Sequence, residues 1–238
     1  MPDETNLTTQ NPDSAVPGES AVIENAASTP DADLCAAIES CASVLGSIIS
    51  RDPRDLEARS VIDGLAAINL LDEWPLGNTE ELARAQVLLR DGAADVPEAL
   101  RDEYKRQFVG PGHFEAPKWA SVYLDPDEVV FGNAHLELRQ WMRENGVEVH
   151  DDPEAGRVPC DSADHELLLL SWLAANRPEA IAPFVANHLM TWFPRYLDLL
   201  EETSKHPFWQ GYAILARTTA QAIADSLEVT APARRVYH

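Results

Sequence analysis

The sequence predicts an all-α fold, built as a single domain of roughly ten helices. Apolar residues recur three and four positions apart in one segment after another, which is the spacing of a helix buried on one face. Proline, glycine and small polar residues interrupt this pattern where helices begin and end. The alternating pattern of a β-strand is almost absent. With 238 residues, of which 45% are apolar, the chain can build a substantial core.

The first two expected helices lie early in the chain. Residues 31–49 carry apolar side chains at helical spacing, among them Leu34 and Leu45. Pro53 ends this helix, because a proline cannot continue the ladder of hydrogen bonds. A second helix is expected over residues 53–72, where apolar residues return at the same spacing.

The next two helices have recognisable ends. Thr79 suits the N-cap of a helix over residues 79–92, and Gly92 suits its C-terminal end. Pro97 falls at the first position of a helix expected over residues 97–108, where its missing N–H costs nothing.

A long segment, residues 109–133, differs from the rest because it combines proline and glycine turns with four aromatic residues. Long connections in compact domains tend to be functional or disordered, and this one is too aromatic for disorder. Trp119 and Tyr123 lie four residues apart within it. Residues of this kind usually pack into a core, but the surrounding turns can also place them at the rim of a groove.

Helical spacing continues to the end of the domain, after a turn-rich acidic stretch at residues 151–161. The remaining expected helices span residues 133–145, 162–175, 178–190, 191–204 and 207–227.

Three regions follow from this pattern. Residues 1–30 contain no Lys or Arg and are rich in Pro, Ser, Thr, Asp and Glu, so we expect a disordered acidic tail. Residues 31–228 form the helical domain, and residues 229–238 are expected to be a flexible tail. No signal peptide is expected, and no apolar stretch comes near the ~20 residues of a membrane span. Stable membrane insertion is therefore not expected.

The composition limits the partners. The chain has 18 basic and 40 acidic residues, for a net charge of -22. Such a field repels nucleic acid and anionic lipid and attracts cationic partners, although it can also serve solubility alone. The three cysteines, Cys35, Cys41 and Cys160, form no CxxC pair, and their odd number argues against a disulfide framework. A reducing, cytoplasmic location is therefore expected.

Motifs for catalysis are weak. The seven histidines form no HExxH pair, and no phosphate-binding loop is present, so we expect no metal site, no nucleotide site and no bound cofactor. Cys160 lies five residues before His165, but a cysteine in a turn near a histidine is common by chance. The sequence does not predict an enzyme.

The Asp164-His165 pair allows two interpretations. Neighbouring residues on a helix point about 100° apart, so these two make a poor mutual acid–base pair. Ser162 is a candidate N-cap, and acidic residues in a first turn complement the helix dipole. The pair could alternatively present one carboxylate and one imidazole on a binding surface. Spacing alone favours the capping role.

Three ordered segments carry a more specific pattern. The first contains Tyr104, Phe108, Gly110-Pro111, Pro117, Trp119, Ser121-Val122-Tyr123 and Phe131-Gly132. The second is Asp161-Ser162-Ala163-Asp164-His165, before an apolar helix. The third contains His188-Leu189, Trp192, Tyr196 and His206-Pro207-Phe208-Trp209. In this order they resemble the signatures of the TorD/DmsD family of redox-enzyme maturation chaperones, over nearly all of residues 31–228.

Three positions depart from the family pattern. Ser162 stands where the family has proline, Asp161 where it has glutamate, and Lys118 where a second proline often precedes the aromatic residue. Ser162 alters how rigidly Asp164 and His165 are presented. Lys118 adds positive charge to a site that is expected to receive arginines.

The resemblance implies an all-α chaperone without catalytic turnover. Such a chaperone binds the twin-arginine leader of a molybdenum- or tungsten-containing oxidoreductase in the cytoplasm until the cofactor has been inserted. The expected partners are this leader and the catalytic subunit of a molybdoenzyme of the DMSO/TMAO-reductase type, with the Tat translocase as a further candidate. The alternatives are an acidic adaptor without leader specificity and a nucleotide-binding protein.

The resemblance also implies a site. The apolar part of the leader is expected to lie against Trp119 and Tyr123, with Tyr104 and Phe108 beneath them. The leader arginines are expected to be attracted by Asp164. The residues expected to assist are His165, Ser121, Glu166 and Asp161.

Overall fold

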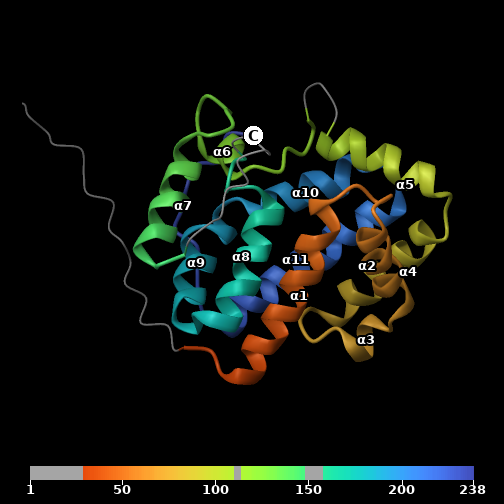
Figure 1. Cartoon of the computed structure of the whole chain (residues 1–238), viewed down its shortest axis with the longest axis horizontal. Helices are drawn as coiled ribbons and strands as arrows, with labels where there is room; N and C mark the ends of the chain where they lie inside the picture. Colours follow the sequence, from red (N-terminus) through yellow and green to blue (C-terminus); the bar gives the residue numbers. More distant parts are fainter. Residues whose placement is uncertain (1–28, 110–113, 148–157) are drawn as a thin grey trace, which may run out of the picture.

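The computed structural model of the chain describes residues 29–109, 114–147 and 158–238. These residues contain eleven α-helices and no β-strand, which confirms the all-α prediction (Figure 1). The acidic tail predicted for residues 1–30 lies outside the described residues except for its last two. Gly110-Pro111 and most of the acidic stretch 151–161 also lie outside them.

The helices follow one another with short connections. They are α1 (Ala32–Ser50), α2 (Leu56–Ala67), α3 (Leu70–Glu73), α4 (Thr79–Ala93), α5 (Pro97–Tyr104), α6 (Ala120–Leu124), α7 (Asn133–Glu144), α8 (Ala163–Asn176), α9 (Ile181–Asn187), α10 (Phe193–Thr203) and α11 (Pro207–Ser226). A π-helical turn, Lys105–Val109, continues α5, and two 3-10 turns, Pro178–Ala180 and Leu189–Thr191, flank α9.

The helix predicted over residues 53–72 is wrong as a single element. Ile68 and Asn69 take extended backbone angles and separate α2 from α3. The Asn69 side chain accepts a hydrogen bond from the Leu71 N–H, and so caps α3. The long connection 109–133 also contains α6, which the sequence did not predict.

The core is organised around α11, which packs against α4 and α10, while α1 packs along α8 (Figure 1). The side chains of α11 that lie in this core include Trp209, Tyr212 and Ile214, none of which is exposed. The pairing of α1 with α8 supports the first turn of α8, where Asp164 lies.

Helix α1 corrects one expectation from the sequence. Among the described residues it is the helix that is long and apolar enough, by length and composition, to cross a membrane. In this fold its apolar face is buried, with Ile38 and Leu45 almost inaccessible, and it packs on α8. It has the pattern of a core helix.

Glycines set the distance between α4 and α11. A Cβ atom placed on Gly92 would lie 2.3 Å from the Phe208 backbone nitrogen, and one on Gly211 would lie 2.9 Å from the Leu89 nitrogen. Real Cβ atoms do not approach backbone so closely. The two helices can therefore touch at these points only because glycine has no side chain.

His188 makes the stability of the fold depend on pH. Its ring packs against Trp141 and Phe184, with centroids 5.4 and 5.9 Å away. Burial, aided by the charge of Arg234, lowers the pKa of His188 from 6.5 to about 4. In the unfolded chain the His188 imidazole binds a proton below about pH 6.5, whereas in the folded chain it binds one only below about pH 4.

We expect His188 to stabilise the fold fully above pH 6.5 and to lose this contribution as the pH falls to 4. The loss reaches about 3 kcal/mol, because each pKa unit corresponds to about 1.4 kcal/mol. Urea unfolding of the wild type and of His188→Gln at pH 4.5 and 7 measures it. The variant should lose less stability over this interval, and equal losses in both proteins would contradict the assignment.

Candidate functional site

Seven of the nine predicted site residues, all except Tyr104 and Phe108, lie where two segments distant in sequence pair with each other. The Ala120 N–H donates to the Asp161 carbonyl at 2.8 Å, and the Ala163 N–H donates to the Lys118 carbonyl at 2.8 Å. These bonds form an isolated antiparallel bridge between Trp119 and Ser162. We call residues 118–123 and 160–166 the α6–α8 junction. It holds the starts of α6 and α8 together.

Asp161 joins the two segments and is not exposed. One carboxylate oxygen accepts hydrogen bonds from the Ser121 N–H, at 2.8 Å, and from the Ser121 hydroxyl. The other oxygen lies 3.8 Å from His135 Nδ1. These hydrogen bonds hold the junction together. Because Asp161 and Ser121 are fully buried, neither side chain is accessible to a ligand.

Asp164 already has a cationic partner. Lys118 Nζ lies 3.0 Å from Asp164 Oδ1, and the two side chains are only 15% and 9% exposed. The same carboxylate oxygen has no hydrogen-bond partner among the described residues, so the ammonium group is its main compensation. The sequence indicated the two residues separately and did not predict that they meet.

His165 points to a different partner. Its Nδ1 lies 2.7 Å from the Ser162 hydroxyl oxygen, and its ring is half-buried. Ser162 precedes α8 as predicted, but its side chain makes no capping hydrogen bond. Ser162 is therefore the N-cap residue by position, as predicted, while its hydroxyl contacts the imidazole instead of a backbone N–H.

Glu166 faces the core. Its carboxylate accepts a hydrogen bond from Trp192 Nε1 at 3.2 Å. Burial, reinforced by the charge of Asp161, raises the pKa of the Glu166 carboxyl well above its usual value. Because the Glu166 side chain is buried, a cation in solvent cannot reach its carboxyl group in this conformation.

The four predicted aromatic residues do not form one exposed floor. Tyr104 and Phe108 are buried and pack together on Trp209, with ring centroids 5.2 to 5.8 Å apart. Tyr123 is fully buried beside Trp192. Only Trp119 is half-exposed, so it alone of the four can offer its ring to a ligand in this conformation.

Comparison with known proteins decides the family. The family described as nitrate reductase delta subunit matches residues 72–198, which include the whole α6–α8 junction. A Tat proofreading chaperone DmsD from Salmonella typhi is 36% identical over 182 residues, covering 75% of this chain and 84% of that protein. The chain belongs to the TorD/DmsD family of redox-enzyme maturation chaperones.

More distant relatives agree with this. A probable Tat proofreading chaperone DmsD from Haemophilus influenzae is 28% identical over 198 residues, covering 82% of this chain and 93% of that protein. The chaperone protein YcdY of Escherichia coli is 27% identical over 189 residues, covering 78% and 92%. The members of the TorD/DmsD family act as chaperones and not as catalysts.

Cys160 fits a chaperone better than an enzyme. Its sulfur lies 3.2 Å from Nδ1 of His135, a residue of α7. Burial, reinforced by the charge of Asp161, raises the pKa of the Cys160 thiol to about 12. The thiolate is the nucleophilic form of cysteine, so this thiol is inert at neutral pH.

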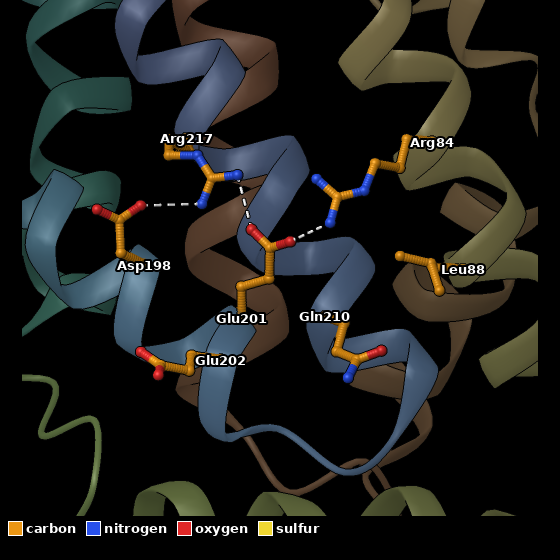
Figure 2. Close-up of a pocket in the computed structure, with 7 residues that line it drawn as sticks. All are labelled: Arg84, Leu88, Asp198, Glu201, Glu202, Gln210 and Arg217. Carbon is orange, nitrogen blue, oxygen red and sulfur yellow. Dashed lines mark hydrogen bonds and ion pairs between the residues drawn. The ribbon is translucent and has the colours of Figure 1, made fainter.

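A polar pocket between α4, α10 and α11 contains none of the predicted site residues (Figure 2). At its centre Glu201 pairs with Arg84 and, at 2.7 Å, with Arg217, which also lies 3.1 Å from Asp198. These charges neutralise one another and link three helices. In this TorD/DmsD protein the charged residues of the pocket therefore stabilise the packing of α4, α10 and α11.

Two contacts at the α6–α8 junction were not predicted from the sequence. Lys118 was noted only as a departure from the family pattern, and the structure gives it the role of partner to Asp164. His135 lies on α7, and it accepts a hydrogen bond from the Cys160 N–H at 3.2 Å, which fixes the turn before α8. Nothing in the spacing of His135 along the sequence signals this contact.

Proposed function

We propose that this chaperone binds the twin-arginine leader of a molybdoenzyme precursor at the α6–α8 junction. It holds the apoprotein in the cytoplasm until the cofactor has been inserted. The observation that carries the proposal is the ion pair of Asp164 with Lys118, because it is a nearly buried carboxylate that already binds a cation.

An arginine of the leader takes the place of Lys118. A guanidinium group is planar and can donate two parallel hydrogen bonds to a carboxylate, whereas an ammonium group acts as a point charge. Asp164 Oδ1, which faces Lys118 Nζ, makes no hydrogen bond within the described part of the chain, so it is able to accept one when Lys118 moves away. Lys118 is long and flexible, so it can swing toward solvent as the arginine enters.

The half-exposed Trp119, next to Lys118 in sequence, provides the apolar contact. Its indole ring packs beside Phe114, with centroids 5.8 Å apart. The ring can stack on a guanidinium group or cover an apolar leader residue. The side chains of Tyr123, Tyr104 and Phe108 are buried, so in this conformation their rings do not contact the leader directly.

The net charge of -22 accelerates the encounter. A long-range acidic field draws in a basic leader, and this effect falls as salt screens it. The catalytic subunit of a DMSO/TMAO-reductase type enzyme is the proposed client, and the Tat translocase is the proposed recipient. The relatives named as Tat proofreading chaperones support a client of the Tat pathway.

Isothermal titration of the full chain with a twin-arginine leader tests the proposal. The leader of a molybdoenzyme encoded beside the chaperone is compared with a variant in which both arginines are alanine, and with a scramble of equal charge. We expect micromolar or tighter binding of the native leader alone. Equal binding of the scramble would leave only a general acidic adaptor, and no binding of any peptide would overturn leader recognition.

A further inference from the structure

The residues that follow α11 lie against residues 115–137, which include the α6 part of the α6–α8 junction. The Tyr237 N–H donates to the carbonyl oxygen of Tyr123 at 2.8 Å. The ring of His238 packs edge-on against the ring of Tyr123, with centroids 5.4 Å apart. Figure 1 shows this end of the chain beside α6. The sequence predicts residues 229–238 to be a flexible tail, and the structure places them in contact with the domain.

Charges on both sides hold the segment in place. Arg234 pairs with Glu137 on α7 at 2.8 Å. His238 Nδ1 lies 3.1 Å from a carboxylate oxygen of Glu128, and Arg195 Nε donates to the main-chain oxygen of His238 at 3.3 Å. Arg234 and His238 of the segment therefore meet acidic groups of the domain, while Arg195 of the domain meets the backbone oxygen of the segment.

The surface beside this segment is apolar and contains unusual backbone. The exposed large apolar residues of this region are Val129, Val130, Phe131 and Leu136. Glu128 and Phe131 adopt φ angles of 50° and 66°, which residues other than glycine rarely do. Such angles persist where the surrounding structure imposes them, and they concentrate at ligand-binding positions. Apolar patches on a surface commonly mark interaction sites.

The segment resembles the expected ligand in chemistry. Residues 234–238 read Arg-Arg-Val-Tyr-His, so two arginines precede an apolar and an aromatic residue. A twin-arginine leader likewise carries arginines ahead of an apolar stretch. Main-chain bonding to the Tyr123 carbonyl does not depend on side chains, so another peptide can form the same bond.

We propose that Glu128, Glu137 and the Tyr123 carbonyl form a peptide-binding surface, that residues 234–238 fill it in the free protein, and that the leader displaces them. This inference rests on the proposed function. It adds that leader affinity is reduced by the fraction of molecules in which the segment is seated.

The test compares three proteins by isothermal titration with the native leader. The first is the wild type, and the second is Arg234→Ala/Arg235→Ala with Tyr237→Pro, which removes the two charges and the donating N–H. The third is Arg51→Ala/Arg54→Ala, which removes two exposed arginines that pair with Glu57 and Asp52 instead. If the segment is seated in about 90% of molecules, the second protein binds about tenfold more tightly. The third should bind as the wild type does.

Amide hydrogen exchange of residues 229–238 gives an independent measurement. Leader should accelerate exchange of the Tyr237 amide in the wild type, because its acceptor is taken by the leader. Leader that binds the wild type and the triple variant equally, without changing this exchange, would overturn the displacement and leave the proposed function standing. Leader that binds neither protein would overturn both, whereas leader that binds only the variant would support both.

Discussion

Replacing Gly92 with alanine is expected to lower the free energy of unfolding by about 3 kcal/mol or more. The new Cβ would lie 2.3 Å from the Phe208 nitrogen and 2.6 Å from its Cα, so backbone on both sides would have to move. Helix α11 packs with both α4 and α10, and a shift at Phe208 would therefore spread through the core. Guanidinium chloride unfolding at neutral pH measures the change.

Gly64→Ala is the matched control. It makes the same substitution inside α2, at an exposed position where a Cβ meets nothing within 4 Å. Alanine is the better helix former, so this variant should gain about 0.5–1 kcal/mol. If both variants change stability alike, the α4–α11 distance is not set by the missing side chain of Gly92.

Replacing Asp164 with asparagine is expected to weaken leader binding by about 10- to 100-fold, because a hydrogen bond to a charged group contributes about 1.5–3 kcal/mol. Asparagine keeps the shape of the side chain but removes its charge. It also leaves the ammonium group of Lys118 without its partner, in a position that repels the incoming arginine. Titration with the leader measures the loss. Adding His165→Ala should increase it only modestly, since His165 contributes one hydrogen bond at most.

Lys118→Met should act in the opposite direction and tighten binding, because the arginine no longer competes with a resident cation. The same change should cost about 1–3 kcal/mol of folding stability, since Asp164 loses its partner.

Asp63→Asn is the control for Asp164→Asn. It removes a negative charge from an exposed side chain on α2 and should leave the affinity for the leader almost unchanged. Circular dichroism would confirm that each variant is folded. An Asp164→Asn protein that is folded and binds normally would remove this residue from the site.

Sequence reasoning succeeds for this fold where one helix carries its own signals. Pro97 begins α5, and the apolar spacing of residues 31–49 matches α1 almost completely. It fails where distant contacts decide the conformation. The break at Ile68-Asn69 contains no proline or glycine that would predict it. Helix α6 has only five residues and lies in a segment rich in turn-forming residues, so its helical pattern cannot be recognised.

The candidate site also combines residues with a clear local signal and contacts that only the fold creates. The Asp164-His165 pair and Trp119 could be singled out because their types and order are distinctive. The pairing of Asp164 with Lys118 could not, because it depends on an antiparallel bridge between segments about forty residues apart. The burial of Tyr123 could not be decided either, since its local pattern favours a core but also fits the rim of a groove.

The pairing of these segments makes the α6–α8 junction a property of the folded chain alone. An unfolded chain leaves Asp161 and Ser121 far apart, so it offers a leader no comparable place to bind. A peptide that occupies the junction must therefore raise the melting temperature, by an amount that grows with its concentration relative to its Kd. At a hundredfold excess over Kd this linkage adds about 2.7 kcal/mol to the free energy of unfolding. Thermal shifts across the leaders of one genome would rank the clients of this chaperone without labelling any of them.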